Sequence, residues 1–509
     1  MSDLNNETKP LNSIESVHLI SYGTDDDRNH LIHENDRAST TSTTSLPQFL
    51  GHKATIGMMG SISIAVNSIT GPAMVDLPAT FQRSGWIPTI VTLLFVCVLS
   101  SLCSLHLADT ISKYPGNLNF EREVEFSESF RYFWGHRWFV VTEILFFVCI
   151  TCLNMSSIVD TAQVVDTFFG HFFGFSSALH ITSTHQNLEV VHWYPAECTA
   201  ETLMAGECLA FADHADGILL TLGYVITTFI FLPMALMDLK ENSVFQIMGF
   251  LVLIATVIQF AIEFGLSGLD FNNMSLWGSS WDALLGVVLF NFALVIAIPA
   301  WLYEKHSSVS VPVVVHGASM LSSLLYIIVG AMGALAIPNV SDNMLESMMS
   351  GSFGITMQAG SILFAFMIIG LGIPLFSVLT RMNLTGSGLT SHLVGNLLAV
   401  YFPFSVSWIL YQGDLVTELL SWGGVIFTSA VAFILPLILA LHTVLEFDLV
   451  GSIEVYGPCW KQQFQSRRTK IVALVIILSL TVMAVVSAIV GQFWIMDDDE
   501  NPSALPRVG

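Results

Sequence analysis

A short polar stretch interrupts the first long apolar segment of this 509-residue sequence. The segment, residues 61–86, reads SISIAVNSITGPAMVDLPATFQRSGW. Its polar or helix-breaking positions are Asn67, Ser68, Thr70, Gly71 and Pro72. Glycine tolerates non-helical backbone, and proline removes an amide donor and disfavours helix at the residue before it. Inside a bilayer the freed backbone groups must be satisfied by neighbouring protein or a water-filled cavity. A break at mid-depth therefore predicts a binding site, where the amides opening the next half-helix attract a small carboxylate.

An acid follows this break. Asp76 lies in the second half of the segment, three residues after Ala73. An acid within a membrane span is costly unless it is paired or faces water, and such acids often mark ion or proton pathways. We hypothesise that Asp76 takes a coupling proton or contacts a substrate ammonium group. The alternative is a fixed structural acid near the outer mouth.

The composition is that of a polytopic membrane protein. Hydrophobic residues make up 53% of the chain and charged residues 11%, against roughly 25% charged residues in soluble domains. The mean hydropathy is +0.68. A formal net charge of −23 argues against nucleic acid or an anionic lipid surface as a partner. The motifs of zinc proteases, serine hydrolases and P-loop enzymes are absent, so no enzyme, metal site or cofactor is expected. The repeated filter segment of an ion channel is also absent, which disfavours a channel.

Eleven apolar stretches approach the length needed to cross a bilayer. They lie at about 54–82, 87–109, 138–168, 217–236, 243–267, 282–303, 311–336, 355–379, 391–411, 417–442 and 471–495. With the N-terminus in the cytoplasm, 15 of the 17 Lys and Arg residues fall on the inner side, as the positive-inside rule requires. The expected organisation is a disordered cytoplasmic tail (1–50), a transmembrane domain (51–496) and a short exofacial tail (497–509).

The long loop 170–216 is expected outside the membrane. Its cysteines Cys198 and Cys208 lie ten positions apart in polar sequence, which makes an exofacial disulfide plausible. The sequons at Asn273 and Asn339 would also lie outside, and predict a glycoprotein.

A second interrupted helix is expected five spans after the first if the two halves form an inverted repeat. The sixth span carries Pro299 inside an apolar run, and Asn291, Phe292 and Ala293 precede it. A mid-span proline removes one helical hydrogen bond, although most such prolines only kink the helix. The position matches the first break, and it leaves two alternatives open for these three residues, pocket lining and plain helix packing.

Two charged residues suggest a gate at the inner face. Glu304 closes the sixth span, and Arg381 closes the eighth. Glu304 would pair with Arg381 or with a basic loop residue and be released when the site opens inward. A solvated surface charge is the usual alternative, because exposed ion pairs contribute little energy.

At these residues the chain resembles the amino acid/auxin permease family of the amino acid–polyamine–organocation superfamily. The first span of that family carries Asn, Gly-x-Gly, Leu-Pro and Gly-Trp, and the corresponding residues are Asn67, Gly71, Leu77-Pro78 and Gly85-Trp86. Its sixth span ends in Pro, an aromatic residue and Glu, matched by Pro299, Trp301 or Tyr303, and Glu304. Its eighth span shows Pro then Arg, matched by Pro374 and Arg381. The similarity extends from about Lys53 to Met496.

The resemblance implies an all-α membrane protein with the leucine-transporter-type 5+5 inverted repeat, about 11 helices, and helices 1 and 6 broken. The substrate carboxylate would meet amides near Thr70–Ala73, and its amino group would meet carbonyls freed in both broken spans. In the sodium-coupled neutral amino acid transporters, the position of Asn67 and a Thr in span eight help to hold sodium. Here residues 368–373 carry no hydroxyl, and the second glycine of Gly-x-Gly is replaced by Ala73, which puts sodium coupling in doubt.

The sequence thus favours a symporter of neutral amino acids in the bilayer, with proton coupling slightly ahead of sodium. The alternative from another class is a membrane amino acid sensor that does not transport. The plasma membrane and the vacuolar or lysosomal membrane both fit the charge pattern.

Overall fold

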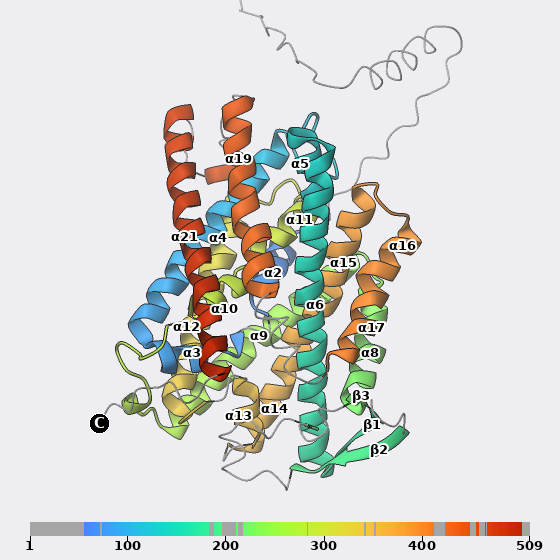
Figure 1. Cartoon of the computed structure of the whole chain (residues 1–509), viewed down its shortest axis with the longest axis vertical. Helices are drawn as coiled ribbons and strands as arrows, with labels where there is room; N and C mark the ends of the chain where they lie inside the picture. The colour runs from blue at the N-terminus through green and yellow to red at the C-terminus, as the bar shows by residue number, and fades with distance from the viewer. Residues whose placement is uncertain are drawn as a thin grey trace, which may run out of the picture. The chain divides into compact units, whose positions relative to one another are not determined.

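Apolar helices form a membrane-type bundle in the computed structural model (Figure 1). The structure describes residues 55–71, 74–182, 188–195, 210–211, 217–281, 284–340, 343–350, 353–411, 423–447, 455–457, 464 and 466–500. All of them belong to one unit, Lys53–Gly509. Cys198 and Cys208, the cysteines of the predicted disulfide, lie outside the described residues, and so do Pro72 and Ala73.

Within the described ranges, nine helical segments are long and apolar enough to cross a membrane. Five are α4 (Trp86–Ser112), α6 (His136–Phe173), α9 (Leu239–Ser267), α12 (Val311–Ala336) and α21 (Arg467–Glu500). The other four combine shorter pieces: α10 (Leu284–Asn291), η5 (Leu294–Ala297) and α11 (Ile298–Glu304); α14 (Ile355–Phe364), η6 (Ala365–Ile369) and α15 (Gly370–Gly386); α16 (His392–Asn396), η7 (Leu397–Tyr401) and α17 (Phe402–Ile409); and η8 (Gly423–Ile434) with α19 (Leu435–Glu446). Two shorter apolar helices, α2 (Met58–Ile69) and α8 (Leu222–Ala235), occupy the first and fourth predicted spans. The prediction of an all-α polytopic membrane protein is therefore confirmed, while the 5+5 repeat stays a prediction.

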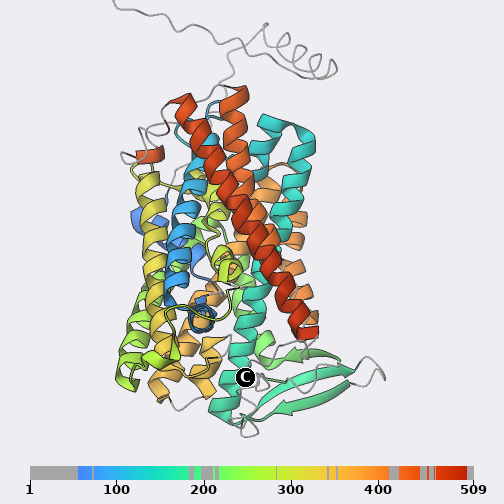
Figure 2. The same cartoon turned by 60° about the vertical axis from the view of Figure 1, so that its left-hand side comes forward.

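The remaining elements lie at the two ends of the bundle (Figure 1). They are α3 (Leu77–Ser84), α5 (Phe126–Trp134), η4 (Phe271–Asn273), α13 (Met344–Ser350) and the strands β1 (Ser176–Thr182), β2 (Leu188–Trp193) and β3 (Gly217–Thr221). The strands form one antiparallel sheet in the order β2-β1-β3, with Ser177 opposite His192 and Leu179 opposite Leu220 (Figure 2). The fourth span is predicted to begin at about residue 217, and its helix begins five residues later, at Leu222. Its start is strand β3, and Thr221 caps α8 by accepting a hydrogen bond from the Tyr224 amide (3.1 Å).

A buried acid joins the sheet to the bundle. α6 ends at Gly174, whose φ of +87° is the left-handed conformation that glycine adopts at helix ends. About two turns earlier, the Asp166 carboxylate accepts hydrogen bonds from the Ser176 hydroxyl (2.7 Å), the Gly223 amide (2.8 Å) and the Tyr411 hydroxyl (2.6 Å). These donors satisfy the acid, so its role is structural.

The half-helix α3 packs tightly on α12. A Cβ atom at Gly330 would come within 2.5 Å of the Phe81 ring, and one at Gly333 would come within 3.0 Å of Pro78. Small residues at such positions let two membrane helices approach closely. The second half of the first span is thus held against the seventh.

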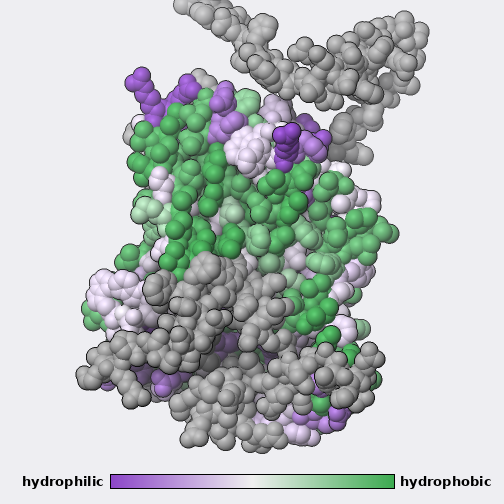
Figure 3. All heavy atoms as spheres, in the orientation of Figure 1, coloured by the Kyte–Doolittle hydropathy of each residue, from purple (hydrophilic) through white to green (hydrophobic). Residues whose placement is uncertain are grey.

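The outer surface of the bundle is apolar, as lipid contact requires. Leu94 is 50% exposed, Phe229 82%, Leu266 81% and Met483 68%. Figure 3 shows hydrophobic residues spread over the upper and middle part of one face, with hydrophilic residues at its upper end. Such a continuous apolar surface marks the part of a protein that meets a membrane.

A buried charge cluster fixes the last span against the second. The Asp109 carboxylate accepts hydrogen bonds from Lys113 Nζ (2.7 Å), Lys470 Nζ (2.7 Å) and the Tyr456 hydroxyl (3.1 Å). The Tyr456 hydroxyl also lies 2.8 Å from His106 Nδ1. The side chains of Asp109 and Lys470 are 1% and 0% exposed. One carboxylate therefore binds both ammonium groups inside the protein, which makes it indispensable to the cluster.

Replacing Asp109 tests this anchor. We expect Asp109→Asn to lower the free energy of unfolding by about 3–5 kcal/mol, because two buried ammonium groups lose their counter-charge. Chemical denaturation of the detergent-solubilised protein measures the change. Glu446→Gln, an exposed acid at the end of α19, is the control and should have no effect. Equal stability of the two variants would contradict the anchor.

Candidate functional site: two interrupted helices

The first span is interrupted where the sequence predicts it. α2 ends at Ile69, and Thr70 has φ −78° and ψ 79°, outside the helical region. The Thr70 amide still bonds Val66 O (2.8 Å), whereas the Gly71 amide turns back to Ile69 O (3.0 Å). Helix resumes at Leu77 as α3, with Pro78 in its first turn, a position where the missing amide costs nothing. Gly71 and Met74–Asp76, which are described between Thr70 and Leu77, thus lie outside regular α-helix.

The sixth span is interrupted before Pro299, and earlier than a break centred on the proline would be. α10 ends at Asn291, Phe292 and Ala293 follow outside the helix, and the 3₁₀ turn η5 leads into α11. Pro299 lies in the first turn of α11, so it starts the second half-helix and does not kink a continuous one. Both helices predicted to be broken are broken.

The two interruptions lie against each other and share one side chain. The Tyr326 hydroxyl of α12 donates a 2.6 Å hydrogen bond to Ile69 O and lies 3.5 Å from Asn291 O. Its ring meets the Phe292 ring edge-on, with centroids 5.5 Å apart. Tyr326 is fully buried. One hydroxyl therefore contacts the last carbonyl of the half-helix in each broken span.

A second side chain satisfies the carbonyl next to this junction. The Ser100 hydroxyl of α4 donates to Phe292 O (2.9 Å). Neither Ser100 nor Tyr326 is among the site residues predicted from the sequence. A signal existed for Tyr326, because His316, Ser319 and Ser323 precede it at helical spacing in an otherwise apolar span.

The predicted polar residues of the two breaks are buried, and most bond locally. Ser68 Oγ donates to Ala65 O (2.9 Å), and Thr70 Oγ1 donates to Val66 O (2.9 Å). Asn291 Nδ2 donates to Val287 O (3.0 Å). Phe292 and Ala293 are 0% and 4% exposed. Of these residues, Asn291 and Phe292 contact Tyr326, through the Asn291 carbonyl and the Phe292 ring.

Asn67 is the exception, because its side chain reaches another helix. Its Nδ2 donates to the backbone oxygen and to Oε1 of Gln246 on α9, both at 2.8 Å. Gln246 Nε2 in turn donates to Asn242 Oδ1 (2.9 Å) and to Leu371 O of α15 (3.1 Å). Asn67 Oδ1 is buried and has no hydrogen-bond donor among the described residues. A buried acceptor left in this way is costly, so it suits a ligand that brings a donor.

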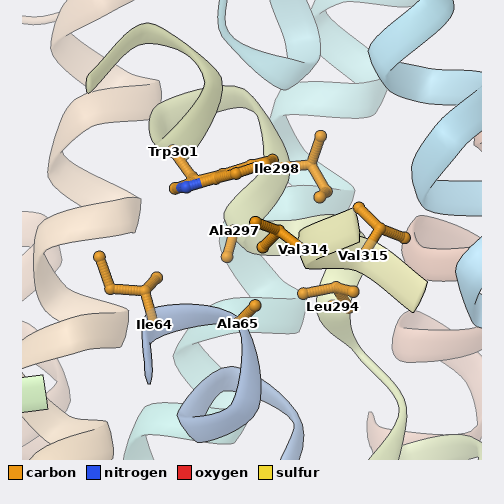
Figure 4. A pocket seen from close by; sticks show the side chains of 8 residues that line it. All are labelled: Ile64, Ala65, Leu294, Ala297, Ile298, Trp301, Val314 and Val315. Carbon is orange, nitrogen blue, oxygen red and sulfur yellow. The ribbon is translucent and has the colours of Figure 1, made fainter. Parts of the chain in front are cut away.

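A small apolar cavity lies beside the interruptions (Figure 4). It has room for about one water molecule. The lining residues come from α2, η5, α11 and α12, and are Ile64, Ala65, Leu294, Ala297, Ile298, Trp301, Val314 and Val315. Figure 4 shows the α2 residues Ile64 and Ala65 across the cavity from Ala297. The cavity offers hydrocarbon contacts to whatever enters it.

Arg381 does not form the predicted ion pair with Glu304, and the alternative pairing of Glu304 with a basic loop residue stays a prediction. Arg381 pairs with Asp238 (3.6 Å), donates to Leu236 O (3.1 Å) and Met237 O, and contacts Asn396. It thereby caps the carbonyl end of α8, a place where a cation is favourable. The end of α11 is instead joined to the start of α2 through the backbone. Glu304 O accepts the amides of Thr55 and Ile56, both at 3.0 Å, and the His306 amide donates to Ile56 O (2.9 Å).

Asp76 lies at the N-cap position of α3 and is partly buried. Its carbonyl accepts the Thr80 amide (3.1 Å) and hydroxyl (3.0 Å), whereas its carboxylate does not cap the helix. Figure 1 shows α3 toward the end of the bundle that carries the sheet. Within the described ranges, no group of three or more His, Cys, Asp or Glu residues could hold a metal ion.

Two broken helices with facing unwound segments, inside an apolar bundle, are the architecture of a membrane transporter whose substrate meets main-chain groups. The family model described as transmembrane amino acid transporter protein matches residues 54–191, which include the first broken helix, α4, α5 and α6. This match confirms the predicted resemblance to the amino acid permeases. No curated protein matches the chain.

Removing the shared hydroxyl tests the junction. We expect Tyr326→Phe to lower the free energy of unfolding by about 0.5–1.5 kcal/mol, because Ile69 O loses one of its two donors and keeps only the Gly71 amide. Thermal unfolding in detergent measures the loss. Tyr401→Phe, at a 42% exposed position, is the matched control. If Tyr326→Phe and Tyr401→Phe both unfold at the same temperature as the wild type, the Tyr326 hydroxyl does not stabilise the breaks.

Proposed function

We propose that this protein is a secondary active transporter of neutral amino acids that works by alternating access. The observation that carries the proposal is the meeting of two interrupted helices at the Tyr326 hydroxyl. Main-chain donors and acceptors freed at that point match the carboxylate and ammonium groups that all amino acids share. The family match over residues 54–191 supports amino acids as the substrate class.

The acceptors for the substrate ammonium are Ile69 O, Asn291 O and Asn67 Oδ1. Tyr326 occupies the first and approaches the second, so its hydroxyl stands where an ammonium group would bind. An ammonium brings three donors, enough to replace the hydroxyl and to satisfy the Asn67 oxygen as well. The exchange keeps every carbonyl paired, which holds its net cost low.

The substrate carboxylate is assigned to the other side of the first break. Gly71 and the residues that follow it lead to the N-terminus of α3, where the helix dipole and unpaired amides favour an anion. A Cβ atom at Gly71 would meet nothing within 4 Å, so there is open space beside this backbone. The apolar cavity of Figure 4, next to both breaks, favours an uncharged side chain.

A proton gradient is the preferred driving force. Sodium needs several oxygen ligands, yet residues 368–373 supply no hydroxyl. The Gln246 side-chain amide donates a hydrogen bond to Leu371 O of α15. This carbonyl is therefore already occupied and is not free to bind a sodium ion between α2 and α15. This arrangement favours protons over sodium as the coupling ion.

Reconstituted uptake tests the proposal. Labelled amino acids of each side-chain class are offered to proteoliposomes, with proton and sodium gradients imposed one at a time. Uptake of neutral amino acids driven by the proton gradient is expected. Binding without any flux would instead identify a sensor, and flux driven only by sodium would overturn the coupling proposed here.

Gly71 provides a test of the carboxylate site. Because a side chain there meets open space and not protein, Gly71→Val should fold normally but fill the space beside the amides. We expect the apparent affinity for substrate to fall about tenfold or more, a loss of about 1.4 kcal/mol of binding. Gly317→Val is the control, since Gly317 on the exposed side of α12 also faces open space. Equal affinity in the two variants would place the substrate elsewhere.

Asp76 provides a test of coupling from the end of the bundle that carries α3. If it takes the coupling proton or contacts the ammonium, Asp76→Asn should abolish the dependence of uptake on the pH at that end, or weaken substrate affinity. Uptake is measured against pH on each side of the vesicle membrane. Unchanged coupling and affinity would leave Asp76 as a structural acid.

A further inference from the structure

A buried glutamate without a donor lies at the other end of the bundle. Glu125 precedes α5 and is 2% exposed, and its Oε1 has no hydrogen-bond partner among the described residues. It occupies the N-cap position of α5, yet its side chain does not cap the helix. Figure 1 shows α5 at the end of the bundle opposite the sheet. Burying an ionised carboxylate in this way is expensive, so the group needs a proton or a cation.

The groups that face Glu125 are acidic or neutral. Glu123 and Glu128 come from its own segment, and Glu143 comes from α6. The Glu143 carboxylate accepts the Ser127 hydroxyl and the Asn383 amide of α15 (2.9 Å). Glu143 thus takes its donors from Ser127 and Asn383, and it brings neither a donor nor a positive charge to Glu125.

The neighbouring cations are engaged elsewhere. Arg122 lies over the Tyr114 ring (4.8 Å), Arg131 over the Phe139 ring (5.4 Å) and Lys305 over the Phe120 ring (5.2 Å). No described cation lies within ion-pair distance of the Glu125 carboxyl, and no metal-binding group forms there within the described ranges. Burial, then Glu123, Glu143 and Glu128, raise the pKa of Glu125 well above its ordinary value. A proton is therefore the ligand that suits this site.

The acidic cluster lies where α15 meets the loop before α5, at the end of the bundle opposite the sheet. We call this end the mouth. Gly386, the last residue of α15, packs on Glu123 and Glu125, since a Cβ atom there would lie 2.8 Å from Glu123 Oε1 and 2.9 Å from Glu125 Cγ. Phe120 of the same loop contacts Lys305, which follows α11 and forms a bridge with Ile56 before α2. Separation of α15 from this loop would let water reach the carboxyl, which would then ionise.

We propose that Glu125 is a proton-binding site at this mouth, protonated while the mouth is closed and deprotonated when it opens to water. The inference rests on the transport function proposed above, because it names the group that exchanges the coupling proton with the solution on this side. Asp76 lies toward the opposite end, so the two acids would serve the two sides.

Two readouts on three proteins test this site: wild type, Glu125→Gln, and Glu121→Gln as the control at an exposed acid of the same loop. In proteoliposomes, Glu125→Gln should reduce proton-driven accumulation of a neutral amino acid tenfold or more but keep exchange of labelled for unlabelled substrate. Glu121→Gln should retain both. Proton-driven accumulation that survives in Glu125→Gln overturns the proposal.

The second readout does not require transport. A carboxyl whose pKa is raised by folding stabilises the protein fully below its unfolded pKa of about 4.3, and this contribution is lost as the pH rises through the folded pKa. The unfolding temperature in detergent should therefore fall with rising pH in wild type and Glu121→Gln, and fall less in Glu125→Gln. Equal slopes in all three proteins, or destabilisation of Glu125→Gln at every pH, would show an ionised structural glutamate. Absence of any flux in wild type would reject the transport function and leave this measurement valid.

Discussion

The hydrogen bond from the Tyr326 hydroxyl to Ile69 O expresses the constraint on which this structure depends. A carbonyl released from a helix inside an apolar bundle has no water to turn to, so another part of the protein must supply its donor. Tyr326 does this at the first break and approaches Asn291 O at the second, and Ser100 does it for Phe292 O. Because these donors are side chains and not the next turn of a helix, a ligand can replace them without rebuilding the backbone. The interruptions are therefore hydrogen-bonded without a ligand, and under the proposed function the same carbonyls would bind the substrate.

The anchoring of the half-helices explains how movement at the breaks would be directed. At one end, α2 begins with a backbone bridge to the residue after α11, so these two halves are tied together. At the other end, α3 is packed on α12 through Gly330 and Gly333. Between these anchors, Gly71 in the first helix and Phe292 and Ala293 in the second lie outside regular α-helix, so the two helices are expected to bend there most easily. Rotation of α2 with α11, against a stationary α3 and α12, would open one mouth and leave the other closed.

The sequence was sufficient for features fixed by local chemistry, and insufficient where a distant partner decides. Gly71 and Pro72 disfavour helix by themselves, so the first break could be read directly. The second break begins at Phe292, where neither glycine nor proline stands; Ser100 and Tyr326 support it from other helices. The long side chain of Arg381 can pair with several partners, and in the structure it binds the carbonyl end of α8 and Asp238, not Glu304. The burial of Glu125 was equally hidden, because an acid in a loop between spans is normally solvated.

The chemistry around the breaks also bears on why a zwitterion is the fitting cargo. The groups that meet there are carbonyls, amides, hydroxyls and apolar side chains, among them Asn67, Thr70 and Tyr326. A ligand with net charge would require a counter-charge to repay its loss of hydration. A zwitterion carries both signs close together, so each of its groups needs only oriented dipoles, and unwound helix ends supply dipoles of both directions. Under the proposed function, the side chain would decide which zwitterions fit, and the hydrocarbon wall formed by Ile64, Leu294 and Val315 would favour a neutral one.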